Sequence, residues 1–553
     1  MPFQKESLSL QQITETNMAA MRKYPAGIQD FERIRRSGFM YVDKTEAIYK
    51  MISDEGPYFL SRPRRFGKSL LISTLAAVFE GRRELFEAFT TDDGIEQPQL
   101  FIATTNWKWE KYPVLCFDFS IGNLSTIEQL DALIDFTLGS YEKQYNITPP
   151  AKDANVRMVN LMRTLHKETG KRVVVLVDEY DSMMLHSLGD AEKQTAIRDR
   201  FQNVFGTLKG EDDHLQFAFI TGISKFSQMG IFSKLNNLEN ISMQINYEQI
   251  CGISEKELVT QLRPDIEQLA ETRGETYDET LAELKRMYDG YHFSTRMTDM
   301  YNPFSMVKAL KSGEIKKYWF DSATPSALID MLSQMPPLEI SDVDGVTCDS
   351  DAFDQAFDSY KAPLPVLYQS GYLTIKDYDR EDDMYTLGFP NQEVRTGFAG
   401  SLYRYVTDTT ADNRDRSALM SAYNLFRRTD NLPAFIEAIK TFYAGIPYQW
   451  EKDNRNEHYY HALLYTLLTS FGADVRAEEP TAKGQTDLTL LMPKGIYVME
   501  IKYNHTAQEA LDQINRKGYA DKYALDGRPV TKVGIAFSSE ERNITGWQAV
   551  PFE

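Results

Sequence analysis

Nine residues between Ser61 and Ser69 have the types and spacing that could hold a triphosphate. Their sequence is Ser-Arg-Pro-Arg-Arg-Phe-Gly-Lys-Ser, which ends in Gly67, Lys68 and Ser69. Backbone N–H groups of such a loop, and the positive end of the helix that follows, attract phosphate oxygens. Lys68 would reach the β- and γ-phosphates, and the Ser69 hydroxyl would ligate Mg²⁺.

The sequence around this loop favours the same chemistry. An apolar run, Tyr58–Leu60, precedes it, and a helical pattern, Leu70–Phe79, follows it, so the order is strand, loop and helix. Arg62 stands where the first glycine of such loops is usual. A basic turn that caps a core helix is the structural alternative. The predicted nucleotide contacts are Arg62, Arg64, Arg65, Phe66, Gly67, Lys68, Ser69 and Leu70.

A second acidic motif lies downstream, where the apolar run Arg172–Val177 ends in Asp178 and Glu179. A continuous apolar run fits a strand of a parallel sheet that is buried on both faces. Ligands bind at the C-terminal ends of such strands. Asp178 would hold Mg²⁺, directly or through water, and Glu179 would orient the attacking water. A buried strand that merely ends at the surface is the alternative.

A third set of chemical residues lies near the C-terminus on a predicted β-hairpin. With a turn at residues 494–495, strand positions that sum to 989 face each other. This register places Asp487 opposite Lys502 and Thr489 opposite Glu500. Because side chains alternate between faces, Asp487, Glu500 and Lys502 are expected on one small patch.

Two neighbouring carboxylates repel each other unless a cation neutralises them, and an all-oxygen pair suits Mg²⁺. Asp487 and Glu500 would form such a site, which can activate a water and stabilise charge on a phosphodiester. Lys502 would position that water or meet the developing charge. Glu457 on the preceding helix would add an oxygen, and Gln513 would help hold the nucleophile. A solvated salt-bridge cluster is the alternative.

Several other polar residues fit either a ligand contact or a structural role. Thr221 and Ser224 follow a third apolar run, and they either sense the γ-phosphate or cap the strand end. The segment 43–45 either touches the nucleotide or begins a helix. We interpret His292 as a core or turn residue, and His458 and His461 as solvent-facing or capping residues, rather than as metal ligands.

The composition limits the class of protein. The chain has 553 residues and a formal net charge of −19. This negative charge argues against a protein that coats a polyanion such as nucleic acid without specificity. No segment approaches the roughly 18 apolar residues of a membrane span, and the first ten residues lack a secretory h-region. Its three cysteines are widely separated, which suits a reducing, cytoplasmic compartment.

We therefore predict a multidomain α/β protein. Residues 1–20 form a flexible leader, 21–250 a parallel sheet flanked by helices, 251–440 a mostly helical lid or linker, and 441–553 a smaller α/β domain. A capping box, Ser254–Glu257, opens the helical region. The strands expected in the first domain are Tyr58–Ser61, Val114–Ser120, Arg172–Asp178 and Gln216–Thr221.

These motifs resemble a known fusion. The segments Gly27–Phe31, Tyr41–Thr45, Arg62–Ser69 and Tyr301–Ser305 are similar to the bacterial AAA-ATPase-like family, often found in Bacteroidetes, whose members also carry arginine at the first loop position. The C-terminal part resembles the PD-(D/E)XK nuclease domain often fused to it. The positions that match its motif are Glu457, Asp487, Glu500, Lys502 and Gln513. Gln485 stands where an arginine is common.

The resemblance implies ATP binding, ATP hydrolysis and a Mg²⁺-dependent nuclease, with DNA favoured over RNA as the substrate. A regulatory switch or scaffold, whose nuclease-like domain binds nucleic acid or protein without cleaving it, stays the alternative, and both the net charge of −19 and Gln485 favour it. A small-molecule kinase has the least support. The sequence leaves open a homo-oligomer and does not identify an arginine that acts across subunits.

Overall fold

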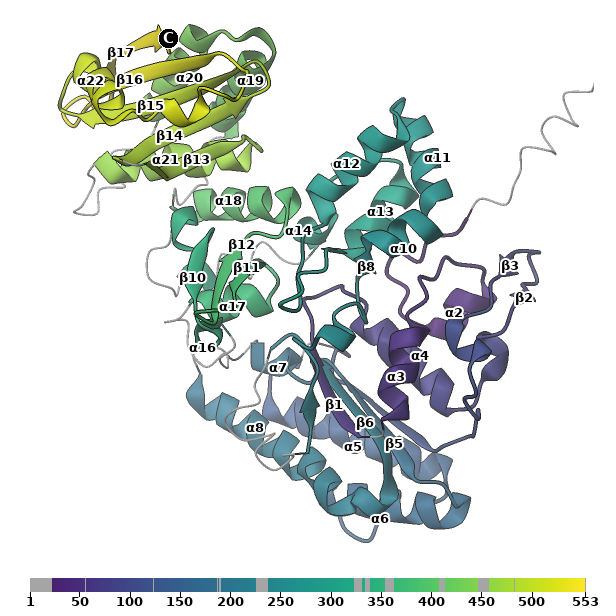
Figure 1. Ribbon diagram of the computed structural model, residues 1–553. Coiled ribbons are helices and arrows are strands. Elements are labelled where there is room, and N and C mark those ends of the chain that lie inside the picture. The colour runs from purple at the N-terminus through teal and green to yellow at the C-terminus, as the bar shows by residue number, and fades with distance from the viewer. Residues whose placement is uncertain are drawn as a thin grey trace, which may run out of the picture. The chain divides into compact units, whose positions relative to one another are not determined.

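The chain folds into two compact units, which comprise Met1–Trp319 with Thr347–Asn391 (unit 1) and Phe320–Val346 with Gln392–Glu553 (unit 2) (Figure 1). The computed structural model describes residues 22–54, 56–122, 124–185, 187, 190–224, 237–322, 331–333, 339–353, 363–406, 413–445, 457–481 and 483–552. The predicted leader, residues 1–20, lies outside these ranges. Within them, no helix has both the length and the apolar character needed to cross a bilayer.

Unit 1 is built on a five-stranded parallel sheet with the order β4-β5-β6-β1-β7. The strands are β1 (Pro57–Ser61), β4 (Val114–Asp118), β5 (Val173–Asp178), β6 (Leu215–Gly222) and β7 (Glu239–Asn240). The four predicted strands are confirmed, with small shifts at their ends. The two-residue edge strand β7 was not predicted, because so short a run carries no periodicity.

Helices cover both faces of this sheet, as the strand order requires. The chain runs from β1 outward to β4 through α4 (Lys68–Phe79), and then returns toward β1 through the other helices. Because crossovers between parallel strands are right-handed, opposite directions place helices on opposite faces. The returning layer consists of α5 (Ile127–Gln144), α6 (Ala154–Thr169) and α8 (Ala191–Phe205), which pack together (Figure 1).

A helical subregion completes unit 1. Its helices are α10 (Glu255–Gln261), α11 (Arg263–Arg273), α12 (Tyr277–Tyr288) and α13 (Pro303–Ser312), and they share a buried apolar core with the pair β8 (Ile253–Ser254) and β9 (Met300–Tyr301). The predicted capping box is confirmed, since Ser254 and Glu257 cap each other's backbone N–H groups. The region also holds α17 (Pro363–Gln369) and an antiparallel sheet of β10 (Val346–Cys348), β11 (Thr374–Asp379) and β12 (Met384–Gly388), which was not predicted.

Unit 2 joins several helices to a five-stranded sheet with the order β13-β14-β15-β16-β17. The elements are α18 (Gln392–Val406), α19 (Asn413–Thr429), α20 (Leu432–Ala444), α21 (Glu457–Ser470), β13 (Val475–Thr481), β14 (Gly484–Met492), β15 (Gly495–Tyr503), α22 (Ala507–Lys517), β16 (Val530–Ser538) and β17 (Asn543–Pro551). Only β15 and β16 pair in parallel. The predicted boundary near residue 440 falls inside this unit, because α18 packs on α21 and α20 packs on β17.

Candidate functional sites

The loop between β1 and α4 has the backbone shape of an anion cradle. Gly67 precedes α4 with φ 96°, and a Cβ added there would meet nothing within 4 Å. A left-handed residue with open space beside it suits glycine. Gly67 has no side chain to cap α4, so the first N–H groups of the helix can turn to a ligand.

Lys68 lies in the mouth of this loop. Its side chain is buried, and its Nζ donates hydrogen bonds to the carbonyl oxygens of Arg62 (3.0 Å) and Pro63 (3.1 Å). The same Nζ lies 3.5 Å from Oε1 of Glu179. The ammonium is therefore held between the loop and the acidic strand end, where it can exchange carbonyl partners for phosphate oxygens.

Ser69 and Asp178 meet at the start of α4 and the end of β5. The Ser69 hydroxyl donates to the buried Asp178 carboxylate. Burial raises the pKa of Asp178 to about 6, although the Ser69 hydrogen bond opposes this rise. Within the described chain, Oδ1 of Asp178 has no hydrogen-bond partner. A hydroxyl beside a buried carboxylate with an unmatched oxygen is a donor set that fits Mg²⁺.

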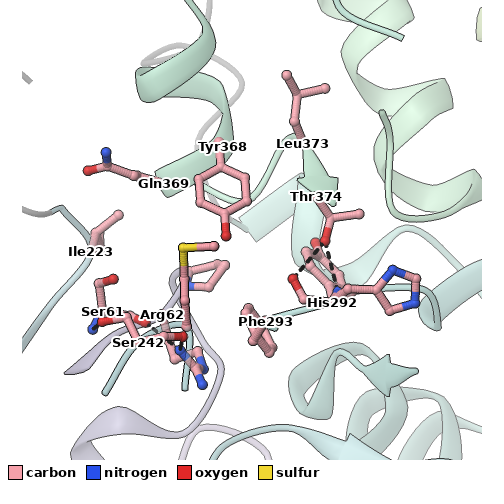
Figure 2. A pocket seen from close by; sticks show the side chains of 13 residues that line it. Ser61, Arg62, Ile223, Ser242, His292, Phe293, Tyr368, Gln369, Leu373 and Thr374 are labelled. Atoms are coloured by element: carbon pink, nitrogen blue, oxygen red, sulfur yellow. Dashed lines mark hydrogen bonds between the residues drawn. The ribbon is translucent and has the colours of Figure 1, made fainter. Parts of the chain in front are cut away.

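Arg62 departs from its predicted role. Its buried guanidinium donates to the carbonyls of Ser242 (2.7 Å) and Tyr247 (3.1 Å) and lies 4.1 Å from the ring centroid of Phe293. Figure 2 shows Arg62 beside Ser61 and Ser242 at the wall of a pocket. The prediction that this guanidinium contacts phosphate needs correction, because protein carbonyls already occupy it; it anchors the base of the loop.

Two other loop side chains also turn toward protein. The Phe66 ring is buried against Tyr291 and Phe293, so the predicted nucleotide contact at Phe66 would be made by its backbone. The exposed Arg65 side chain lies over the ring of Phe304 at 4.2 Å. Arg64 is half-buried, and its contact with a nucleotide stays a prediction.

Leu70 lines an open pocket beside the loop with about 590 Å³ of empty space. Its walls are mostly apolar and come from the chain before the loop, from the start of α4 and from the helical subregion. They include Tyr41, Val42, Gly67, Leu70, Ile253 and Val307. An apolar pocket next to a phosphate cradle has the chemistry that a nucleobase requires.

The polar residues that fit either a ligand contact or a structural role have structural partners within the protein. Thr221 donates to the Leu60 carbonyl (2.9 Å), and Ser224 donates to Asp181 (2.6 Å), so both secure the end of β6. Asp43 accepts from the N–H and hydroxyl of Thr45, where α3 (Thr45–Ser53) begins. Both ring nitrogens of His292 have partners, the Ile375 carbonyl (2.6 Å) and Asp299 (2.8 Å).

In unit 2, the hairpin of β14 and β15 differs from the predicted register by two residues. Leu488 pairs with Met499 and Met492 pairs with Gly495, so facing positions sum to 987 and the turn is at 493–494. The predicted pairs Asp487–Lys502 and Thr489–Glu500 are wrong. Because a shift by two leaves every side chain on its original face, the convergence survives. Continuing the register by one pair sets Asp487 opposite Glu500.

Glu500 is the centre of the second site. It has no exposed surface, and its Oε1 accepts hydrogen bonds from Lys502 Nζ (2.9 Å) and from Gln513 Nε2. Its Oε2 has no hydrogen-bond partner within the described chain. Burial, followed by the charge of Asp487, raises the pKa of Glu500 to about 7. This burial excludes the alternative of a solvated salt-bridge cluster.

Asp487 completes the pair. Its Oδ2 accepts a hydrogen bond from the Ile501 N–H at 2.7 Å, which fixes the carboxylate beside β15. Burial raises its pKa, although that hydrogen bond opposes the rise. A half-buried acid beside a fully buried acid with an orphaned oxygen fits a divalent cation. In the described chain, no group of three or more acidic, His or Cys side chains is arranged for a metal, and the Glu457 side chain lies outside the described residues.

Comparisons with known proteins assign both regions. Residues 25–232 match the family model described as Predicted AAA-ATPase, and residues 455–547 match that of the PD-(D/E)XK nuclease superfamily. A relative from Azotobacter chroococcum mcd 1, described as an uncharacterized protein in the vnfD 5' region, is 34% identical over 541 residues, which cover 95% of this chain and 98% of that protein.

The chain belongs to the predicted AAA-ATPase family and carries a PD-(D/E)XK superfamily nuclease domain. The match to the first model contains the phosphate loop and the acidic strand end, and the match to the second contains the hairpin and α22. The resemblance expected from the motifs is confirmed. So is the multidomain α/β fold, with its helix-flanked parallel sheet and helical middle.

Two polar residues near these sites have roles that the sequence interpretation did not identify. His461 donates from Nε2 to the Asp487 carbonyl at 2.5 Å, which anchors the acid's backbone; its spacing of four residues from Glu457 on one helix was the available signal. Asp181, two positions after Glu179, accepts from the N–H groups of Ile223 and Ser224. It therefore ties the acidic strand end to β6.

Proposed function

We propose that unit 1 binds and hydrolyses ATP and that unit 2 is a Mg²⁺-dependent nuclease acting on nucleic-acid phosphodiesters, with DNA favoured over RNA. The observation that carries the proposal is that the chain has two sites, one suited to an anion and the other suited to a divalent cation. One is an anion cradle with a buried lysine in its mouth, and the other pairs the half-buried Asp487 with the buried Glu500, whose Oε2 lacks a hydrogen-bond partner within the described residues.

In unit 1, each part of the nucleotide has a counterpart in the chain. The N–H groups at Gly67 and the start of α4 would receive the phosphates, and Lys68 would leave its carbonyl partners to meet them. The base would occupy the pocket beside Leu70. Ser69 and Asp178 would hold Mg²⁺, which lends positive charge to the transferring phosphoryl group. Glu179 would orient the attacking water, with Lys68 beside it.

In unit 2, Asp487 and Glu500 would hold the metal ion, which supplies positive charge to a water and to the scissile phosphate. Lys502 has its ammonium on Glu500 and would turn to the attacking water or to the developing phosphate charge. Gln513 holds the same carboxylate oxygen from α22, and so keeps Oε2 directed away from that pair of donors. Glu457 remains a proposed further oxygen ligand.

A Mg²⁺ titration with end-labelled DNA and RNA, with and without ATP, tests this function. We expect new ends from DNA only when Mg²⁺ is present, and phosphate release from ATP in the same preparation. The runner-up, an ATP-dependent switch or scaffold, predicts that the nucleic acid binds and keeps its length. Gln485, in place of a common arginine, and the net charge of −19 favour that alternative. Three unpaired cysteines support a proposed cytoplasmic setting.

A further inference from the structure

Five consecutive residues of the phosphate loop each contact a residue from the later part of unit 1. One set of these contacts joins Pro63 to Gly371 and the Arg64 carbonyl to the Trp319 indole Nε1 (2.9 Å). The same set places the guanidinium carbons of Arg62 and Arg65 4.1 and 4.2 Å from the ring centroids of Phe293 and Phe304, and the ring centroids of Phe66 and Tyr291 4.8 Å apart. We name Tyr291, Phe293, Phe304, Trp319 and Gly371 the collar. Figure 2 shows Phe293 beside Arg62 at the base of the loop.

The collar holds the loop from outside by both shape and hydrogen bonding. Gly371 has φ 86°, and a Cβ added to it would lie 2.6 Å from the Pro63 Cβ, so its backbone is pressed against the proline ring. Trp319 is almost fully buried, and its indole Nε1 donates to the Arg64 carbonyl at 2.9 Å. The backbone N–H of Trp319 donates to the Ser305 hydroxyl, which fixes the indole to α13.

The Trp319 hydrogen bond acts at a strained point of the loop. The Arg64 carbonyl belongs to the peptide that leads into Arg65, whose φ is 64°. A left-handed conformation is unfavourable for a residue with a side chain and persists only where its surroundings impose it. This loop also has Arg62 where such loops usually have a flexible glycine. External contacts must therefore supply the shape that glycines otherwise permit.

We propose that Trp319 is a positioning residue for the phosphate loop, and that the collar makes the helical subregion an integral part of the nucleotide site. This rests on the proposed ATP-binding function. Trp319 is also the last residue of unit 1 before the chain enters unit 2 at Phe320. Its indole hydrogen bond therefore joins the phosphate loop to the chain segment that continues into unit 2.

The test compares two variants in the full-length protein. Trp319→Phe keeps an aromatic ring and removes the indole donor. Tyr318→Phe is the matched control, because it removes a donor from the preceding residue, whose hydroxyl bonds Ser312 and Glu314 rather than the loop. Affinity for N-methylanthraniloyl-ATP, hydrogen exchange of the amides at 62–69 without nucleotide, and the thermal midpoint are measured for each.

We expect Trp319→Phe to bind the analogue about tenfold more weakly, as the loss of one buried hydrogen bond allows. Its loop amides should exchange faster, while the thermal midpoint stays close to that of Tyr318→Phe. Unchanged loop exchange in Trp319→Phe, or an equal effect in Tyr318→Phe, would overturn the proposal. If the wild type does not bind the analogue, ATP binding fails, and exchange in the nucleotide-free protein still decides the positioning role.

A second pair of variants covers the case in which Trp319→Phe does not fold. Gly371→Ala would push a Cβ into Pro63. Gly94→Ala introduces an alanine at a similar φ, 78°, with nothing within 4 Å, so it imposes the backbone strain without the clash. We expect faster loop exchange and weaker analogue binding only for Gly371→Ala. Equal behaviour of the two alanine variants would contradict a collar that shapes the loop.

Discussion

The phosphate loop and the acidic hairpin both place a lysine beside a glutamate, but the groups around that pair suit an anion in the loop and a cation in the hairpin. In both sites a lysine ammonium lies within 3.5 Å of a glutamate oxygen, Lys68 with Glu179 and Lys502 with Glu500. In the loop the lysine is surrounded by carbonyls and by a helix N-terminus, so it can exchange these for an anion. In the hairpin the lysine and Gln513 share one oxygen of Glu500, which leaves the other for a cation.

This difference shows that the hydrogen-bond donors or acceptors that a site presents to a ligand indicate its chemistry better than the types of residue in it. Lys, Glu and Asp occur in both, but the loop presents donors and the hairpin presents acceptors. The pKa values of Asp178 and Glu500 are both raised by burial, so each carboxylate gains from a cation that it lacks in the protein alone. We expect the two sites to respond separately to substitution.

The largest expected effect is on the hairpin. Asp487→Asn keeps an oxygen for the Ile501 N–H but removes the charge that a divalent ion requires, so nuclease activity should fall about 1,000-fold or more. ATP hydrolysis should stay near the wild-type value. Asp512→Asn, an exposed acid on α22, is the control. Undiminished cleavage by Asp487→Asn would place the metal site elsewhere.

Lys68→Ala should produce the reverse pattern. Loss of the ammonium in the loop mouth should lower ATP turnover about 100- to 1,000-fold, because its positive charge would no longer meet the β- and γ-phosphates. Phosphate release and end-labelled DNA cleavage, measured without ATP, separate the two sites. Lys50→Ala removes an exposed lysine on α3 and should have no effect. An equal loss of ATP-independent cleavage in Lys68→Ala would contradict the expectation that the two sites respond separately to substitution.

The two sites also differ in how far the sequence predicts them. Gly67, Lys68 and Ser69 are contiguous in the sequence. Asp178 and Glu179 come at the end of a continuous apolar run, which is typical of a strand buried on both faces. The local sequence was therefore sufficient to predict these positions. Phe66 and Arg62 were assigned to the nucleotide because a local pattern contains no information about Phe293, Tyr291 or Ser242. Their true partners come from distant segments.

The hairpin shows the opposite limit. A turn placed one residue too late changed the register by two, yet the alternation of strand side chains kept Asp487 and Glu500 on one face. The sequence therefore predicted which side chains share a face of the hairpin, but not which residues pair across its two strands. The sequence also gave no sign of β13, whose partner strand is β14, or of the collar, because strand pairing and aromatic packing depend on tertiary contacts.

A smaller effect is expected at Gln513. Its amide orients Glu500 without carrying charge, so Gln513→Ala should weaken Mg²⁺-dependent cleavage about 10- to 100-fold, the range for groups that orient metal ligands. Gln508→Ala is a matched control, because Gln508 lies exposed on the same helix and bonds Asp512 instead. If extra Mg²⁺ does not restore any part of the activity of Gln513→Ala, a role in orienting the ligand is contradicted.

The smallest predicted difference separates the two sites by pH. A carboxylate must lose its proton to hold a cation, and the pKa is about 7 for Glu500 and about 6 for Asp178. Lowering the pH should therefore weaken Mg²⁺ at the hairpin first, by about tenfold per unit below pH 7. The loop site should follow about one unit lower. Mg²⁺ titrations of cleavage and of ATP hydrolysis between pH 5 and 8 measure both.

The same raised pKa has a consequence for folding that needs no activity assay. In the folded protein without metal, Glu500 keeps its proton up to about pH 7, whereas the unfolded chain releases it near the ordinary glutamate pKa of 4.5. The native state then binds more protons over that interval, so stability falls as pH rises through it. Glu500→Gln, which cannot ionise, should lose this dependence in chelator. A wild-type thermal midpoint in chelator that does not fall between pH 5 and 8 would mean that the carboxylate is already ionised without a metal ion, and would contradict a hairpin site that needs a further cation.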